Sequence, residues 1–483
     1  MENYRMYIGG KWVDSLGGEV FEDFNPYTGN AFAKIAGGGG AEAKMAIDAA
    51  RDAFPAWAAV TYREKQELFN KAAEILNRRL TDVADMLVRE SGAVSFYSRF
   101  QAASGKDLLL ESAVQASRMI GEILPSASEG CMSMSWRQPC GVVASISPWN
   151  APFVLSLRAV CFPIAYGNTV VLKPSSETPI SGGALIAEIF EEAGFPEGVL
   201  NVIYNGPGKS SEIGDVFTSD PRVRRISFTG STDVGRHLAM QCGQNLKRIV
   251  LELGGSCPMI VLKDADIDYA VRAAVMGRFV HQGQICMSTK RFIVEKPVAE
   301  EFTDKLVKKV SGLKYGDPAA ADTFVGPIIN KSQFNKIRAQ VERAIEQGAR
   351  CICGNDAEGL VFKPTVLAGI TEDMDIAGEE VFGPVACVIS ADDADDAVRL
   401  ANKTSFGLSS GIITADTALA FDIAGRLEAG CSHINDCTVS DEPNAPLGGM
   451  KDSGWGRNGN AGIDEFTELR WVTYQRKERH FPV

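Results

Sequence analysis

Short runs of β-favouring residues alternate with helical segments along most of this chain, and this alternation restricts the possible folds more than any other feature. Predicted strands occupy residues 141–146, 168–172, 199–204, 225–228, 259–262 and 291–294. Predicted helices occupy residues 41–54, 62–90, 181–193, 298–311 and 331–347. Because strand, crossover helix and strand form a parallel βαβ unit, we expect an α/β fold. The rhythm restarts after Gly255, so two α/β layers should meet near Leu253.

Charge and cysteine content restrict the partners and the compartment. The 483 residues carry a formal net charge of -12, which repels phosphate backbones and anionic lipid and argues against nucleic-acid and membrane partners. The first ten residues lack the apolar core of a signal peptide, and no run of 18 apolar residues is present. Eleven scattered cysteines and four histidines predict free thiols in a reducing cytoplasm and no metal site.

Two segments could hold the phosphates or ribose of a dinucleotide. Gly230 and Ser231 follow a predicted strand and open a helix, where backbone N–H groups and the helix dipole attract anions. Lys173 ends another predicted strand, where a lysine can reach a ribose hydroxyl or a phosphate. Each has an ordinary alternative, since glycine is common before a capped helix and a lysine before a proline is commonly exposed.

Three further residues have side chains suited to carbonyl chemistry. Asn150 lies between prolines where a strand turns into a helix, and its amide could donate to an oxyanion or simply cap the turn. Glu252 ends an apolar strand, where burial would raise its pKa toward that of a general base, unless it is a paired structural residue. Cys286 could be a nucleophile or inert core, and ten other cysteines compete with it.

Six segments in the same order and at similar spacing resemble the aldehyde dehydrogenase superfamily. These segments read SPWNAP (147–152), NTVVLKPS (168–175), FTGSTDVG (228–235), LELGG (251–255), GQIC (283–286) and EEVFGP (379–384). The resemblance extends from IGGKWV (8–13) and NPYTG (25–29) to LGGMKDSG (447–454), and therefore covers almost the whole chain.

The resemblance implies a role for each matched residue. Cys286 would attack the aldehyde carbon, while Asn150 and the Cys286 backbone N–H would hold the oxyanion. Loss of hydride to a nicotinamide would leave a thioester, and Glu252 would activate the water that releases the acid. The implied cofactor-binding residues are Lys173, Ser176, Trp149, Gly230, Ser231, Glu380 and Phe382.

Two departures from the family pattern indicate the cofactor and the substrate. Many NAD-preferring relatives carry a glutamate where this chain has Ser176, and a serine would not repel a 2′-phosphate, so NADP should be accepted, alone or beside NAD. Arg158 lies on the helix expected to line the substrate tunnel, one turn after Val154 and beside Leu155 in the wall. It could meet a ring hydroxyl or a carboxylate, or be an ordinary surface arginine.

The substrate group that the chain resembles most is that of the benzaldehyde, vanillin and salicylaldehyde dehydrogenases. Residues 277–288, including Ile285 and Met287 beside the nucleophile, look like that group, as do residues 433–436 and 441–443. Succinate semialdehyde enzymes also carry the first arginine but typically a second one at the position of Val280, so they, or enzymes of other aliphatic aldehydes, are the alternative. Glu252 argues against a CoA-acylating relative, and the intact Cys286, Glu252 and Asn150 argue against a non-catalytic nicotinamide-binding protein.

The implied fold has three parts. A Rossmann-like cofactor domain would comprise residues 1–120 and 140–252, and an α/β catalytic domain residues 253–451. Residues 121–139 and 468–483 would form a small oligomerisation arm, because an exposed strand edge pairs readily with another subunit. We therefore expect a homodimer or homotetramer that acts on a small-molecule aldehyde.

Overall fold

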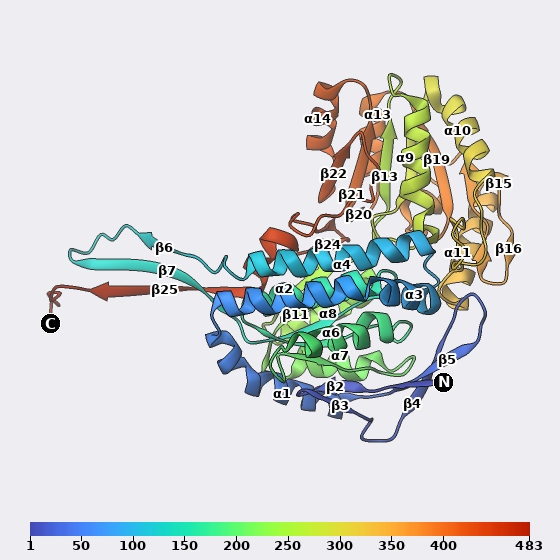
Figure 1. The fold of residues 1–483 in the computed structure, drawn as a ribbon. Helices are drawn as coiled ribbons and strands as arrows, with labels where there is room; N and C mark the ends of the chain where they lie inside the picture. The colour runs from blue at the N-terminus through green and yellow to red at the C-terminus, as the bar shows by residue number, and fades with distance from the viewer.

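Two large, mostly parallel sheets lie on either side of a central seam in the computed structural model, which describes all 483 residues (Figure 1). The first sheet has the order β24 (Gly454–Trp455), β12 (Arg248–Glu252), β11 (Val223–Thr229), β8 (Val142–Ile146), β9 (Thr169–Lys173), β10 (Leu200–Val202), β2 (Met6–Ile8) and β3 (Lys11–Val13). Its five strands from β12 to β10 are parallel, and the strands added at both edges are antiparallel. The predicted α/β fold is confirmed.

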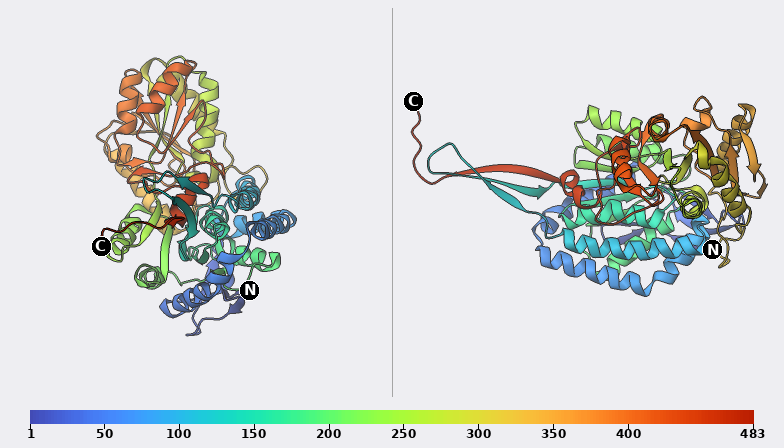
Figure 2. Two further views of the ribbon diagram at one scale, coloured as in Figure 1. Left: turned by 90° about the vertical axis from the view of Figure 1, so that its left-hand side faces the viewer. Right: turned by 90° about the horizontal axis from the view of Figure 1, so that it is seen from above.

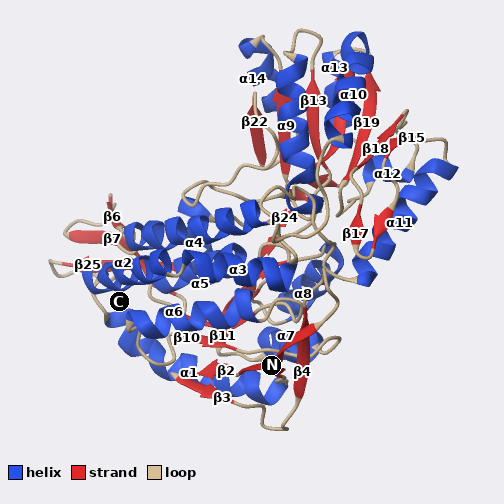
Figure 3. Ribbon diagram, turned by 45° about the vertical axis from the view of Figure 1, so that its right-hand side comes forward, coloured by secondary structure: helices blue, strands red, loops and turns tan.

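Helices cover both faces of the first sheet (Figure 3). One face contacts α1 (Gly40–Ala59), α7 (Ser210–Ser219) and α8 (Thr232–Gln244). The other contacts α5 (Pro152–Ala165) and α6 (Leu185–Ala193), over which pack α2 (Tyr62–Arg78), α3 (Leu80–Ser91) and α4 (Ser95–Gln115). A cluster of 65 buried apolar residues fills this half, so both helical layers are anchored by hydrophobic burial.

The second sheet has seven strands, of which only the first runs antiparallel to its neighbour. Its order is β15 (Arg350–Cys353), β18 (Thr365–Ala368), β19 (Val385–Ala391), β14 (Thr289–Glu295), β13 (Cys257–Val261), β21 (Ser409–Ile413) and β22 (Cys431–Ile434). The helices around it are α9 (Ile267–Phe279), α10 (Lys296–Ser311), α11 (Lys331–Glu346), α12 (Asp375–Gly378), α13 (Ala394–Asn402) and α14 (Thr417–Arg426). Separate apolar clusters lie on its two faces, as expected for a parallel sheet buried on both sides.

A three-stranded arm projects from the body beside the C-terminus (Figures 1 and 2). It has the order β25 (Thr467–Gln475), β7 (Cys131–Pro139) and β6 (Gly121–Leu124), all antiparallel. Ile123 and Trp471 on the arm are 78% and 72% exposed, so the arm presents apolar side chains to its surroundings.

The remaining elements are short and lie at the periphery or the seam. These are β1 (Glu2–Tyr4), β4 (Val20–Phe24), β5 (Ala31–Ala36), β16 (Ala357–Glu358), β17 (Val361–Phe362), β20 (Phe406–Gly407), β23 (Met450–Lys451) and α15 (Gly462–Phe466), with 3₁₀ turns at Val280–Gly283 and Gly459–Ala461. None of the helices has both the length and the apolarity needed to cross a bilayer.

Two helices differ from the sequence expectation. The segment predicted as helical at residues 62–90 divides into α2 and α3 at Arg79, which has a non-helical backbone and ends the first helix. The helix predicted at residues 181–193 begins with a π turn, Ile180–Ala184. Gly183 lies in that turn against Tyr204, where an added Cβ would come within 2.8 Å of the ring, so the wider turn accompanies close packing on β10 and its loop.

Candidate active site

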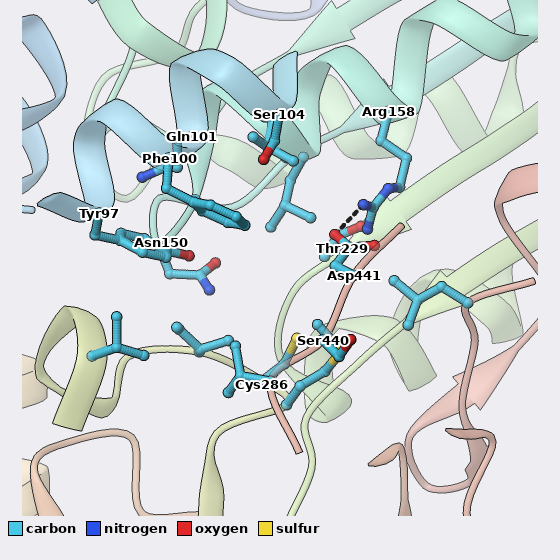
Figure 4. Close-up of a pocket in the computed structure, with 18 of the residues that line it drawn as sticks. Tyr97, Phe100, Gln101, Ser104, Asn150, Arg158, Thr229, Cys286, Ser440 and Asp441 are labelled. Carbon is cyan, nitrogen blue, oxygen red and sulfur yellow. Dashed lines mark hydrogen bonds and ion pairs between the residues drawn. The ribbon is translucent and has the colours of Figure 1, made fainter. Parts of the chain in front are cut away.

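A cavity of about 270 Å³ opens at the seam between the two halves (Figure 4). Its walls come from α4, α5, the end of β12, the loop before β14 and the loop after β22. Most of the lining is apolar, and the buried cluster behind it contains residues of both halves, such as Tyr97 and Ile285. The three candidate catalytic residues, Asn150, Glu252 and Cys286, all face this one cavity.

Cys286 is held by an unusual loop between α9 and β14. His281, Gln282 and Gly283 all have positive φ angles, of 50°, 56° and 69°, and two of these residues are not glycine. This strained backbone is anchored by the Gln282 amide, which donates 2.9 Å hydrogen bonds to the carbonyls of Gly92 and Pro327. Gly283 lies so close to Gly383 that an added Cβ would come within 2.5 Å of its carbonyl oxygen. Glycine at position 283 therefore allows the two backbones to approach closely.

The thiol of Cys286 is protonated in the protein alone. Burial raises its pKa to about 12, and the Lys290 ammonium opposes this shift only in part. Lys290 is itself occupied, donating 2.8 Å and 2.5 Å hydrogen bonds to the carbonyls of Ile285 and Cys286. A nucleophilic thiolate at this position therefore requires additional positive charge or a proton acceptor.

Asn150 is oriented by the same loop. It precedes α5, and its Nδ2 donates a 2.9 Å hydrogen bond to the Gln284 carbonyl. The second hydrogen on Nδ2 and the backbone N–H of Cys286 donate to no acceptor within the protein. Two donors are thus available in the cavity that the sulfur lines, as an oxyanion-binding site needs.

Glu252 ends β12 with a buried carboxyl group. Desolvation raises its pKa to about 8, and the charges of Arg158 and Arg457 oppose that shift. Asn458 donates a 3.1 Å hydrogen bond to Oε1 and fixes the group at the cavity edge. A carboxyl group with a pKa near neutrality is suited to accept a proton from water.

The predicted cofactor residues cluster at the carboxyl edge of the first sheet. Lys173 ends β9 in a buried position, where desolvation lowers the pKa of its ammonium group to about 8. The only hydrogen bond that this ammonium group donates is a long one of 3.4 Å to the Pro174 carbonyl. Gly230 and Ser231 join β11 to α8, and Ser231 makes no side-chain cap. Ser176 is half-buried in the loop after β9. The Lys173 ammonium and the Ser231 hydroxyl thus keep hydrogen-bonding capacity that the protein itself does not use.

The other predicted cofactor residues lie at the seam. Glu380 accepts a 3.0 Å hydrogen bond from the Gly255 backbone and lies 3.7 Å from the Lys290 ammonium. Phe382 meets Trp149 edge-on, with ring centroids 5.5 Å apart. An added Cβ at Gly254 would come within 2.5 Å of the Glu380 carboxylate, so a larger residue there would displace the end of that side chain.

The predicted substrate residues line the cavity. Val154, Leu155 and Arg158 project from α5, and Ile285 and Met287 flank the nucleophile. Arg158 is only 6% exposed, so the alternative of a surface arginine is wrong. Nor is it a free cation, because its guanidinium forms an ion pair with Asp441.

Sequence reasoning missed several residues of the site. Tyr97 and Phe100 form an aromatic wall from α4, and no motif marked them. Asp441 was noticed only as part of a family-like segment, not as a partner of Arg158. An arginine in an apolar helix wall does signal that a carboxylate must lie nearby, but 283 residues separate this pair along the chain.

Known proteins match this chain over nearly its full length. A family model described as "Aldehyde dehydrogenase family" matches residues 12–472. A vanillin dehydrogenase of Pseudomonas fluorescens is 42% identical over 99% of each chain. A benzaldehyde dehydrogenase of Bacillus subtilis is 42% identical over 99% of this chain and 98% of its own. The solved structure of a salicylaldehyde dehydrogenase of Pseudomonas putida G7, complexed with salicylaldehyde, superposes with a TM-score of 0.98 at 39% identity over 100% of both chains.

Proposed function

Because the chain belongs to the aldehyde dehydrogenase family, and is therefore an oxidoreductase that acts on aldehydes, we propose that it oxidises an aromatic aldehyde to the carboxylic acid through a thioester on Cys286. The observation that carries this proposal is the convergence of Asn150, Glu252 and Cys286 on one largely apolar cavity.

The first step is attack of the Cys286 thiolate on the aldehyde carbon. The carbonyl oxygen becomes an alkoxide as the C–S bond forms, and the Asn150 amide and the Cys286 backbone N–H donate to it. The thiol proton must pass to solvent first, because only the thiolate is nucleophilic.

A nicotinamide dinucleotide fits the residues at the edge of the first sheet. Lys173 offers a buried ammonium with only one long hydrogen bond to a ribose or phosphate. The start of α8, after Gly230 and Ser231, offers backbone N–H groups to a pyrophosphate. Glu380, Phe382 and Trp149 would position the nicotinamide end. When bound, this group accepts the hydride that the tetrahedral carbon loses.

Glu252 completes the reaction by releasing the acid. With its carboxylate ionised, it takes a proton from a water molecule that attacks the thioester carbon, and the C–S bond then breaks to return Cys286. The hydrogen bond from Asn458 keeps the carboxylate directed along the cavity edge. Hydrolysis gives the free acid, not a CoA thioester.

The aromatic substrate class is supported by the cavity wall and by the relatives. Tyr97, Phe100 and Leu155 present flat or branched apolar surface suited to a benzene ring. The vanillin, benzaldehyde and salicylaldehyde dehydrogenases found at about 40% identity act on such rings. Succinate semialdehyde is disfavoured by Val280, which lines the cavity where a second arginine would be needed.

Use of NADP, alone or beside NAD, is part of the proposal. The carboxylate nearest to Ser176 in sequence belongs to Glu177, one position further along the chain. Serine at position 176 is uncharged and does not repel a 2′-phosphate as a glutamate at that position would. Measuring kcat/KM with both cofactors tests the idea, and strong exclusion of NADP would contradict it.

Assembly and location complete the proposal. We expect a homodimer or homotetramer, supported by the exposed apolar side chains on the arm formed by β6, β7 and β25. A cytoplasmic location is supported by the need for a reduced nucleophile and by ten further free cysteines. Neither nucleic acid nor membrane is expected as a partner of so acidic a chain.

A spectrophotometric screen of aldehydes with both cofactors tests the proposed activity. We expect benzaldehydes to be oxidised to free acids without CoA, and unsubstituted or ring-substituted aromatics to exceed butanal and succinate semialdehyde in kcat/KM. A preference for either aliphatic aldehyde by about tenfold or more would overturn the aromatic assignment.

A further inference from the structure

One wall of the cavity carries an ion pair, in a lining that is mostly apolar but also includes Thr229 and Ser440. Arg158 on α5 donates from Nη2 to Oδ2 of Asp441, which lies in the loop after β22 (Figure 4). The two side chains are only 8% and 21% exposed, and both line the cavity. Their neighbours there include Leu155, Phe100 and Val439, which offer them no hydrogen bonds. The pair therefore brings no net charge to the cavity but does bring polar atoms.

The pair leaves hydrogen-bonding capacity unused. Oδ1 of Asp441 is buried and has no hydrogen-bond partner. The Arg158 guanidinium has five N–H groups, yet its hydrogen bond to Asp441 is the only one that it makes. An unsatisfied carboxylate oxygen in a buried site is costly, so such an atom on a cavity wall marks the place where a ligand donor fits.

We propose that Asp441 is a specificity-determining residue that accepts a hydrogen bond from a neutral hydroxyl group on the ring of the substrate. This inference rests on the proposed oxidation of aromatic aldehydes and narrows it to hydroxy-substituted benzaldehydes. The same ion pair excludes aldehydes that carry a carboxylate, because Arg158 is already neutralised and Asp441 repels a second anion.

The protonation state of such a substrate favours the chemistry. An ionised phenol at the ortho or para position donates electron density through the ring to the aldehyde carbon and makes it a poorer electrophile. Asp441 disfavours that anion and accepts a hydrogen bond only from the neutral form. The residue thus selects the form of the substrate that Cys286 attacks more readily.

Matched substrates isolate this hydrogen bond. A methoxy group keeps the ring and the oxygen but cannot donate, so the ratio of kcat/KM for hydroxy- over methoxybenzaldehyde measures the donation. For the best of the 2-, 3- and 4-isomers, we expect a ratio of at least about ten in the natural protein. A ratio near one, with benzaldehydes still oxidised, would overturn the inference alone. Failure to oxidise any benzaldehyde would instead overturn the proposed function.

Variants of the pair then identify the acceptor. D441L removes it and leaves Arg158 unpaired, so the hydroxy-over-methoxy ratio should fall about tenfold and kcat/KM for carboxybenzaldehyde should rise by a similar factor. R158M/D441L removes both charges, so the hydroxy-over-methoxy ratio should fall while kcat/KM for carboxybenzaldehyde does not rise. This double variant supplies the test if D441L does not fold. E442Q, which alters the exposed acidic neighbour, should change neither quantity. An unchanged ratio in the variants at position 441 would contradict the inference.

Discussion

Two regions of the same cavity treat buried charge in opposite ways. The reactive floor, made of Asn150, Glu252 and Cys286, contains two ionisable groups without a direct counter-ion, and burial raises the pKa of both. The paired wall, made of Arg158 and Asp441, joins two opposite charges in direct contact. On the floor, burial raises the pKa values of both groups and so changes their protonation. On the wall, the cost of burying each charge is offset by the opposite charge beside it. The contrast is what we expect if the floor performs the proposed chemistry and the wall recognises the ring of the substrate.

The most severe test of this contrast removes the sulfur. C286A should lower aldehyde-dependent reduction of cofactor by roughly 10⁵-fold, because Cys286 is the only thiol that lines the cavity. Steady-state absorbance at 340 nm measures the rate. C351S, which alters an exposed cysteine, is the matched control and should keep full activity. Retention of the original rate in C286A would refute the whole assignment.

Neutralising the base is expected to have the next largest effect. E252Q should slow turnover about 10³-fold, while a rapid first equivalent of reduced cofactor still forms, since the thioester is made but not hydrolysed. In the natural protein, kcat should rise with pH through about 8, because the base works in its deprotonated form. Stopped-flow traces and the pH profile of kcat check both points. Loss of the first equivalent in E252Q would show that Glu252 acts mainly before hydride loss.

Removing the oxyanion donor should cost somewhat less. N150A should lower kcat/KM about 10²-fold, a typical effect for one lost donor to a developing alkoxide. Asn150 also donates to Gln284 in the loop that holds Cys286, and N150D keeps the shape of the side chain but removes both donated hydrogen bonds, so the two variants distinguish loss of shape from loss of donation. Steady-state kinetics of both variants is the measurement, and full activity in N150D would contradict the role of donor.

The paired wall should respond in stability. R158M leaves Asp441 buried without its partner and should lower the free energy of unfolding by about 2 kcal/mol, a value reduced for the partial exposure of the pair. R158M/D441L should recover most of that loss. Chemical denaturation measures both. Equal stability of R158M and the natural protein would mean that the pair contributes nothing.

The smallest expected effect is on stability at the reactive floor. There, removing the ionisable group should raise the stability at high pH, whereas R158M lowers it. The pKa of Glu252 is raised by folding, so its contribution to stability is complete below pH 4.5 and is lost as the pH rises through about 8. E252Q lacks this titration and should therefore melt higher than the natural protein at pH 9, by about 1 °C or more, with little difference at pH 5. Differential scanning calorimetry at the two pH values checks it. A lower Tm for E252Q at pH 9 would contradict the origin assigned to the shift.

Sequence patterns captured the parts of this molecule that are local in the chain. The strands that end near Lys173 and Gly230 are predicted within a few residues, because a buried parallel strand is a short apolar run. The break between α2 and α3 was not predicted, since residues 62–90 keep a helical spacing of apolar side chains through Arg79. Periodicity reports which face is buried, but not where the backbone turns.

Long-range pairings were the part that the sequence could not supply. The paired wall depends on two residues from opposite halves, and the burial that raises the pKa of Glu252 depends on how those halves close. The wall of Tyr97 and Phe100 comes from α4, whose exposed and buried apolar residues are too mixed to indicate a binding face. These properties arise from packing of the whole chain and not from local composition.

The two-residue strand β24 has a consequence for the order in which activity arises during synthesis. It pairs with β12 beside Glu252, through Gly454, and Asn458 just beyond it donates to the same carboxyl group. More than two hundred residues must therefore be translated after the glutamate before its surroundings are complete. A ribosome-bound chain that stops before residue 450 would contain the nucleophile and the dinucleotide edge but would lack the segment that encloses the base, so the final residues, 450–483, complete the surroundings on which catalysis depends.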